Sequence, residues 1–346
     1  MIKIGNEIIG EKTYVVLEAG VNHNGSFDRA IELIDKAAEA GADAIKFQTY
    51  RADTLVTRDA LKFWDWEGDD DKTTQYEAYS KLDGFSWDNY PLLIKHCEEK
   101  GIEFLSTPFD FESADFLNKI GMKAFKIASS DITYLPFLQH IAKFGKPIIL
   151  STGASTIGEI QEAIDIIKGE GNNQIVVLQC TLKYPTATKD ANLGVIPTLS
   201  KVFPEAIVGF SDHTRGINAP IVATTLGAKL IEKHYTVNKT LLESADHWLS
   251  VDPVEAKQMI EGIRDAEDMI GSSEKKVFEC EAQTRKYDKR SIIANIDIKK
   301  GTEITREMLI CKRPGIGIAP KFISIIVGRT AQEDISEDTI MLWNQI

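Results

Sequence analysis

The feature that most constrains the fold is an alternation of short apolar runs with helix-like stretches. The apolar runs have strand character and occupy residues 14–18, 44–48, 103–106, 124–127, 147–151, 175–179, 206–211 and 230–234. The helix-like stretches that follow them occupy residues 29–40, 87–100, 112–120, 135–144, 157–168, 197–202, 218–226 and 253–270. Eight successive β-then-α units predict an α/β protein, a (β/α)8 TIM barrel, with a doubly wound parallel sheet as the alternative.

The periodicity ends near residue 271, where the chain turns polar and charged. We expect residues 1–275 to form the barrel domain and residues 276–289 to form a linker. Residues 290–346 then form a small β-rich domain with short strand-like runs. A domain of that length buries little surface by itself, so we expect it to dock on another part of the protein.

Composition limits the classes of partner. The net charge of −12 argues against nucleic acid and against an anionic membrane surface. No apolar run approaches the ~20 residues that a membrane-spanning helix needs, and the first residues lack the layout of a signal peptide. The four cysteines are scattered without paired spacing, so we expect reduced thiols and a cytoplasmic protein.

Polar side chains stand at the end of each predicted strand. In a parallel barrel these ends converge on one face. The residues are Glu18, Lys46, Gln48, Thr107, Lys126, Ser129, Asp131, Ser151, Tyr184, Ser211, His213 and His234. Any single lysine or histidine among them could be purely structural, but their joint occurrence predicts a functional site.

The residue types in this set indicate two chemistries. Lysines with serine and threonine hydroxyls suit a phosphate or carboxylate dianion. His213 and His234 end neighbouring strands, and two imidazoles with water or a carboxylate can hold Mn²⁺, Co²⁺ or Zn²⁺. Residues 51–85 form an unusually long connection with an acidic run at 65–71, either a lid over the site or a solvated loop.

Several short motifs occur in order along the chain. They are Glu18-Ala-Gly-Val-Asn-His-Asn-Gly25, Gly41-Ala-Asp-Ala-Ile-Lys-Phe-Gln-Thr49, Ser106-Thr-Pro-Phe109, Phe125-Lys-Ile-Ala-Ser129, Leu150-Ser-Thr-Gly153, Tyr184-Pro-Thr186, Gly209-Phe-Ser-Asp-His-Thr214 and Ile231-Glu-Lys-His234. Together they resemble the sialic acid synthase family. The tail, with Arg290-Ser-Ile-Ile-Ala294 and Lys312-Arg-Pro-Gly315, resembles the antifreeze-like (SAF) domain of that family.

The resemblance implies a reaction and an assembly. Such enzymes condense phosphoenolpyruvate (PEP) with an N-acetylmannosamine-type aldose, giving phosphate and a nine-carbon 2-keto-3-deoxy sugar acid such as sialic, legionaminic or pseudaminic acid. The resemblance also implies a divalent metal, Mn²⁺ first and Mg²⁺, Co²⁺ or Zn²⁺ otherwise. It implies a homodimer in which the tail of one subunit caps the active site of the other.

Roles carry over by motif. The resemblance assigns PEP binding to Lys46, Thr107, Lys126, Ser129, Ser151 and Ser211, and metal binding to His213 and His234. It assigns sugar binding to Glu18, Gln48, Asp131, Tyr184, Asp246 and, from the partner subunit, Arg313. Glu18, Asp131 and Lys46 would be catalytic. Asp131 stands where the family often has the longer Glu, and Leu182 where many members have Asn.

Two other functions remain open from the sequence. A Schiff-base aldolase is also a barrel with a strand-end lysine as nucleophile, and Lys126 or Lys233 would fill that role. A catalytically silent sugar-acid sensor, using the tail as an interaction module, is the non-enzymatic alternative.

Overall fold

The computed structural model describes residues 1–62, 64, 73–241, 244 and 246–346. The chain divides into two compact units, Met1–Gly271 and Ser272–Ile346. The division falls in the polar stretch that follows the eighth β-then-α unit.

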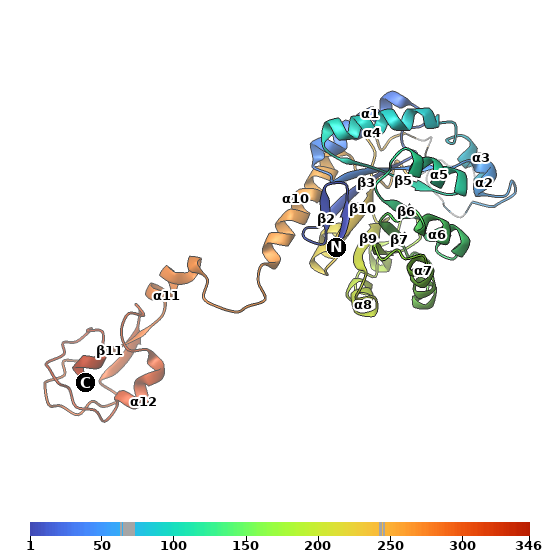
Figure 1. Ribbon diagram of the computed structural model, residues 1–346. Coiled ribbons are helices and arrows are strands. Elements are labelled where there is room, and N and C mark those ends of the chain that lie inside the picture. The colour runs from blue at the N-terminus through green and yellow to red at the C-terminus, as the bar shows by residue number, and fades with distance from the viewer. Residues whose placement is uncertain (63, 65–72, 242–243, 245) are drawn as a thin grey trace. The chain divides into compact units, whose positions relative to one another are not determined.

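The first unit is built on eight parallel strands, in the sheet order β5-β4-β3-β10-β9-β8-β7-β6 (Figure 1). They are β3 (Tyr14–Gly20), β4 (Ala44–Thr49), β5 (Glu103–Pro108), β6 (Phe125–Ile127), β7 (Ile148–Ser151), β8 (Ile175–Cys180), β9 (Ile207–Asp212) and β10 (Leu230–His234). The end strands β5 and β6 contact each other, so the sheet is a nearly closed barrel. The predicted (β/α)8 fold is confirmed.

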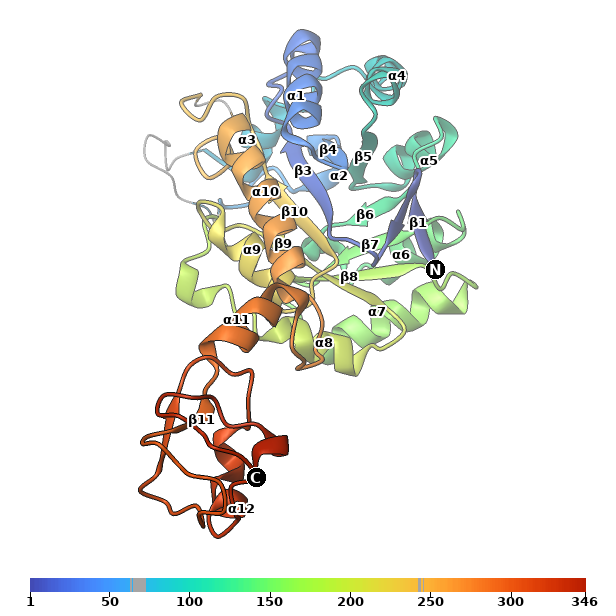
Figure 2. The same ribbon diagram turned by 90° about the vertical axis from the view of Figure 1, so that its left-hand side faces the viewer.

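Helices surround the barrel (Figure 2). They are α1 (Phe27–Ala40), α4 (Tyr90–Lys100), α5 (Phe111–Lys119), α6 (Leu135–Ala142), α7 (Ile157–Gly169), α8 (Val195–Val202), α9 (Asn218–Thr225) and α10 (Pro253–Ile270). In α1, apolar residues at helical spacing, from Ala30 and Leu33 to Ala40, are buried against the sheet. The helix begins at the Ser26 cap and ends at Gly41, whose φ of 87° is the left-handed conformation that glycine tolerates.

A short antiparallel hairpin, which no sequence pattern indicated, precedes the barrel. It consists of β1 (Ile2–Ile4) and β2 (Glu7–Ile9). Its Ile2, Ile4 and Ile9 share a buried cluster with residues that begin the barrel strands, such as Tyr14 and Ala44. The hairpin therefore fills the amino end of the barrel, and the carboxyl end is left for ligands.

Short helices and turns lie in the connections that follow the carboxyl ends of the barrel strands. Between β4 and α4 lie α2 (Ala52–Leu55), α3 (Gln75–Ser80) and the 3-10 turn η1 (Trp87–Asn89). Residues 63 and 65–72 of this connection, which include the acidic run, lie outside the described residues, so the lid hypothesis stays a prediction. Two further 3-10 turns are η2 (Ser129–Asp131) after β6 and η3 (Thr188–Asp190) after β8.

The second unit has its own small core, formed by Ile292, Ile298, Leu309, Ile326 and Met341 among others. Its elements are η4 (Glu279–Glu281), α11 (Ala282–Asp288), β11 (Ser291–Ala294), β12 (Leu309–Lys312), η5 (Pro320–Phe322), α12 (Ile323–Ile326) and η6 (Trp343–Gln345). Strands β11 and β12 pair antiparallel, and isolated bridges extend the β structure. The predicted small β-rich domain is confirmed. Among the described residues, no helix is long and apolar enough to cross a membrane.

Candidate active site

The carboxyl ends of the barrel strands surround a cavity of about 1070 Å³. Its lining brings together nearly all of the predicted site residues: Glu18, Lys46, Gln48, Thr107, Lys126, Ser129, Asp131, Ser151, Tyr184, Ser211, His213, His234 and Asp246. Arg313 lies in the second unit, where its Nη1 is 2.6 Å from Asp288 Oδ1. A cavity of this size can hold two small substrates at once.

Two lysines and two carboxylates form the centre of the cavity. Lys46, from β4, forms an ion pair with Glu18 of β3, and its Nζ lies 3.6 Å from Glu232 Oε2. Lys126 Nζ, from β6, lies 3.5 Å from Glu232 Oε1, which also accepts a 2.8 Å hydrogen bond from the Ser211 hydroxyl. Glu232 thus bridges two cations, one from β4 and one from β6.

The pKa values of the two carboxylates, Glu18 and Glu232, are shifted in opposite directions. Burial raises the pKa of Glu18 to about 7, although the neighbouring Lys46 opposes the shift. Burial alone would also raise the pKa of Glu232, but Lys126 and Lys46 hold it at about 2. Near neutral pH, Glu232 is therefore ionised while Glu18 can accept or release a proton.

Hydroxyl groups surround the lysines. Lys46 Nζ donates to Thr107 Oγ1 at 2.9 Å, and the backbone N–H of Gly153 donates to Ser129 Oγ at 2.9 Å. Ser151 Oγ is buried without a hydrogen-bond partner among the described residues, which leaves it free for a ligand. A Cβ at Gly153 would lie 2.8 Å from Ser129 Oγ, so glycine is needed for this close approach. These groups form a cradle for an oxyanion.

The two predicted metal ligands are neighbours. The ring centroids of His213 and His234 are 5.3 Å apart, and His213 Nδ1 lies 2.9 Å from the carbonyl oxygen of Thr181. A Nδ1–H donated to that carbonyl leaves Nε2 as the metal-binding nitrogen. His234 Nδ1 is buried without a hydrogen bond and 3.4 Å from Asp246 Oδ2.

The protonation of the rings bears on metal binding. Burial and the nearby His213 lower the pKa of His234 well below its usual value, so this ring is neutral. Burial acts in the same direction on His213, but the adjacent Cys180 outweighs it and raises the pKa to about 9. The described residues contain no group of three or more acidic, histidine or cysteine ligands for a metal ion. The pair fits an ion that keeps open positions and displaces a proton from His213.

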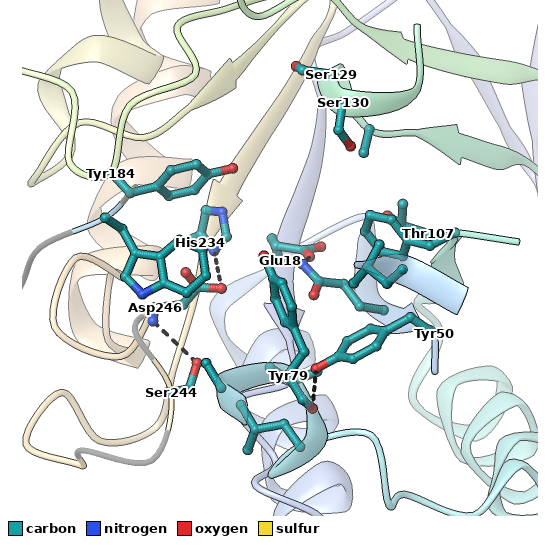
Figure 3. A pocket seen from close by; sticks show the side chains of 18 of the residues that line it. Glu18, Tyr50, Tyr79, Thr107, Ser129, Ser130, Tyr184, His234, Ser244 and Asp246 are labelled. Atoms are coloured by element: carbon teal, nitrogen blue, oxygen red, sulfur yellow. Dashed lines mark hydrogen bonds and ion pairs between the residues drawn. The ribbon is translucent and has the colours of Figure 1, made fainter. Parts of the chain in front are cut away.

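The residues assigned to the sugar line the same cavity, and Figure 3 shows Glu18, Tyr184 and Asp246 among them. Gln48 Nε2 donates to Glu18 Oε1 at 3.1 Å, and the ring centroid of Tyr184 is 4.1 Å from that of His213. Burial raises the pKa of both Asp131 and Asp246 to about 6. Asp131 Oδ2 has no hydrogen-bond partner in the described part of the chain, so it is available to a ligand.

Some lining residues had no role assigned from the sequence. Glu232 appeared in the sequence only within the Ile231-Glu-Lys-His234 motif, without a role. The signal that could have found it is its position two residues before His234 in β10, on the same face of the strand. Tyr50 and Tyr79 also line the cavity, and their rings meet edge to face with centroids 5.5 Å apart. Tyr79 comes from α3, which no sequence pattern connected to the site.

Lys233, a candidate Schiff-base nucleophile, lies outside the cavity lining. It is fully buried, and its Nζ is 2.7 Å from Asp212 Oδ2 and in contact with the carbonyl oxygen of Thr214. The alternation of side chains along β10 places Glu232 and His234 toward the cavity and Lys233 away from it. Lys233 is therefore a structural ion-pair partner.

Comparisons with known proteins agree with this architecture. Residues 33–275 match the NeuB family, and residues 289–346 match the SAF domain. The chain is 44% identical over 338 residues to the N,N'-diacetyllegionaminic acid synthase of Legionella pneumophila, covering 96% of this chain and 94% of that protein. It is 38% identical to the pseudaminic acid synthase of Campylobacter jejuni, with 96% of each covered.

A solved structure shares the fold at appreciable identity. The N-acetylneuraminic acid synthetase of Leptospira borgpetersenii, in complex with citrate, matches with a TM-score of 0.72 and 33% identity, covering 82% of this chain and 94% of that one. The barrel with its polar cavity, together with relatives that are named synthases, identifies this chain as a TIM-barrel enzyme. It belongs to the NeuB family and carries a SAF domain.

Proposed function

We propose that this chain is a nonulosonate synthase. It condenses PEP with an acetamido-aldose of the N-acetylmannosamine type and yields a nine-carbon 2-keto-3-deoxy sugar acid and phosphate. The observation that carries the proposal is one cavity that joins the Lys46–Glu232–Lys126 cluster to the His213–His234 pair. Relatives that match nearly the whole chain are named for products of this kind.

The lysine end suits PEP. PEP carries a phosphate and a carboxylate, and two cations with four nearby hydroxyls can neutralise and orient both groups. Thr107, Ser129, Ser151 and Ser211 supply those hydroxyls. Glu232 already pairs with both lysines. A bound PEP would therefore interact with lysines that also remain paired with the Glu232 carboxylate.

The aldose would lie toward Asp131, Tyr184, Gln48 and Asp246. In its open form it presents an aldehyde, and the C3 carbon of PEP attacks that carbonyl carbon to form the new C–C bond. Water then adds to the electron-poor C2 carbon and gives one proton to a base, and the new alkoxide takes a proton. Phosphate leaves by cleavage of the C2–O bond as the C2 carbonyl forms, and the second proton of the water leaves with it as hydrogen phosphate.

Glu18 is the first choice for these proton transfers, with Asp131 as its partner. A pKa of about 7 lets Glu18 act in either direction near neutral pH. Lys46, in contact with Glu18, stabilises its ionised form and the charge that develops on the phosphate. When bound at His213 and His234, a divalent metal, Mn²⁺ first, supplies Lewis-acid polarisation of the aldehyde oxygen.

The aldose and the assembly are also proposals. Candidates are N-acetylmannosamine and a diacetamido-trideoxyhexose, and the 44% identical relative is named for a diacetylated product. We propose a homodimer in which Arg313 of the partner subunit contacts the acyl group of the sugar. We also propose a cytoplasmic location, which suits the four free cysteines.

The deciding experiment is incubation with PEP, Mn²⁺ and a panel of acetamido-aldoses, with phosphate release and mass detection of nine-carbon acids. The proposal expects one acid and one equivalent of phosphate, and loss of both with a chelator. A Lys126→Met variant should form both products more slowly at limiting PEP, because it lacks one cation of the oxyanion cradle. Tight PEP binding with no product from any aldose would instead favour a sugar-acid sensor.

One observation favours a second function, a Schiff-base aldolase. Burial lowers the pKa of Lys126, as a lysine nucleophile requires. Lys126 is, however, 3.5 Å from Glu232 and donates to the carbonyl of Ile127, so its nitrogen is held as a cation. Borohydride trapping of a keto-acid on Lys126 would establish the aldolase and overturn the synthase.

A further inference from the structure

The sequence motif at residues 18–25 contains polar residues that the proposed chemistry does not use. Glu18, Val21 and Asn24 line the cavity, but Asn22 and His23 do not. Asn22 is fully buried, with an exposed fraction of 0%. A buried amide must find hydrogen-bond partners, and the partners of this motif lie on a different loop, the connection between β10 and α10.

Asn22 reaches the backbone of that connection through Ser250. Its Nδ2 donates to the carbonyl of Tyr235 at 2.9 Å and lies 3.5 Å from Ser250 Oγ. The Ser250 hydroxyl in turn donates to the backbone carbonyl of Asp246 at 2.6 Å, and the N–H of Ser250 reaches the same oxygen at 3.1 Å. Ser250 itself is 2% exposed.

Asn24 holds the same connection through His247. His247 Nε2 lies 3.1 Å from Asn24 Oδ1, and Nδ1 lies 2.8 Å from Thr236 Oγ1. The histidine is fully buried and adjoins Asp246 in the chain. On the other side, the backbone N–H of Asp246 donates to Ser244 Oγ at 3.2 Å, as Figure 3 shows. Side-chain hydrogen bonds therefore hold the backbone on both sides of Asp246.

The hydrogen-bond network of Asn22, Asn24, His247 and Ser250 surrounds the backbone of Asp246. Its carboxylate lines the cavity and lies 3.4 Å from His234 Nδ1. We propose that Ser250 and His247 are positioning residues that, supported by Asn22 and Asn24, hold Asp246 in place for the aldose. This inference rests on the proposed function, in which Asp246 contacts the sugar. A carboxylate on a loop is precise only when surrounding hydrogen bonds fix its backbone.

The proposal predicts a defect confined to one substrate. The PEP cradle uses Lys126, Ser129 and Ser151, at or just after the ends of β6 and β7. In the described part of the chain, no hydrogen bond joins these three residues to Asn22, Asn24, His247 or Ser250. Ser250→Ala should therefore raise KM for the aldose about fivefold, the worth of one ordinary hydrogen bond, and leave KM for PEP unchanged. Ser250→Thr keeps the hydroxyl and should restore most of the aldose affinity.

Ser113→Ala is the matched control. Ser113 is also fully buried, and its hydroxyl donates at 2.9 Å to the backbone carbonyl of an aspartate, Asp110, at the start of α5. It does not line the cavity. Ser113→Ala should lower the melting temperature as any lost buried hydrogen bond does, with both KM values unchanged. Equal changes in the two KM values of Ser250→Ala, or none, would overturn the positioning role.

Amide hydrogen exchange separates this inference from the proposed function. Ser250→Ala should speed exchange in residues 246–251 by at least a few-fold relative to Ser113→Ala, whatever the substrate is. If the wild-type protein condenses no aldose, the proposed function fails, and exchange alone decides whether the network holds this segment. Unchanged exchange there would overturn the inference even in an active synthase.

Discussion

The imidazole rings of His213 and His234 lie side by side at the ends of neighbouring strands, with their centroids 5.3 Å apart. The ring of Tyr184 packs against both, at 4.1 and 5.9 Å between centroids. These ring contacts fix the directions of the two buried imidazoles before any ligand arrives. This preorganisation is what a metal site needs from its first two ligands.

His213→Ala should abolish turnover and leave the fold intact. Loss of an ion that polarises the aldehyde removes several kcal/mol of transition-state stabilisation, so the rate should fall at least about a thousandfold. Turnover, circular dichroism and Mn²⁺ binding by calorimetry are the measurements. His140→Ala is the control, since its ring pairs with Asp115 outside the cavity. Near-full activity in His213→Ala would refute the metal role.

Lys126 and Lys233 should respond differently to replacement by methionine. Lys233→Met breaks a fully buried ion pair with Asp212, so it should cost about 3–5 kcal/mol of unfolding free energy. Lys126→Met removes a cation from the oxyanion cradle, so its main effect should be about a 10- to 100-fold weaker affinity for PEP. Denaturant unfolding and calorimetric titration with PEP measure the two quantities. Equal losses of PEP affinity would contradict the assignment.

The fold was predictable because its signals are local and repeated. Apolar runs such as 44–48 and 175–179, each followed by helical periodicity, give the strand and helix order directly. The convergence of Lys46, His213 and His234 then follows from the parallel barrel alone. The hairpin at residues 2–9 escaped prediction because short strands carry little periodicity, and only the barrel's open amino end explains its burial.

The finer parts of the site depend on distances that a sequence does not encode. Nothing in the order of residues shows that Glu232 bridges Lys46 and Lys126 while Lys233 turns away. The link from Asn24 to His247 joins residues more than 200 positions apart in the chain. Such contacts are set by how strand ends and loops pack, so they become visible only in the structure.

The stability of the protein should depend on pH through Glu18. Its folded pKa of about 7 lies above the ordinary 4.5, because burial favours the protonated form. Below pH 4.5 both folded and unfolded chains hold the proton. Between pH 4.5 and 7 only the folded chain holds it, so stability falls as pH rises, by on the order of 3 kcal/mol. As the pH rises from 4.5 to 7, the melting temperature of the wild type should fall relative to that of Glu18→Gln, because the variant carries no carboxylate to ionise.

Glu205→Gln is the control for that pH series. Lys168 holds the pKa of the exposed Glu205 carboxyl below its usual value, which is the opposite direction. The stabilisation that the Lys168–Glu205 ion pair gives the folded chain is present above pH 4.5 and is lost only at more acidic pH. The difference between Glu205→Gln and wild type should therefore stay constant from pH 4.5 to 7. A similarly flat difference for Glu18→Gln would show that Glu18 is not the group responsible.

Complementation tests whether Arg313 acts on the partner subunit's site. Lys46→Ala damages the barrel and Arg313→Ala damages the tail, so each homodimer should be inactive. In a mixed dimer with exchanged tails, the intact barrel of the Arg313→Ala subunit meets the intact tail of its partner. Random mixing should then recover about a quarter of wild-type activity, since half of the dimers each gain one complete site.

The matched control combines two subunits that each carry a substitution in the barrel. Coexpressed Lys46→Ala and Lys126→Ala subunits give mixed dimers in which every barrel is damaged, so exchanged tails cannot restore activity. Native mass spectrometry should confirm mixed dimers in both experiments, and phosphate release from PEP measures activity. If mixed dimers of Lys46→Ala and Arg313→Ala form but stay as inactive as this control, Arg313 does not complete the neighbouring subunit's site.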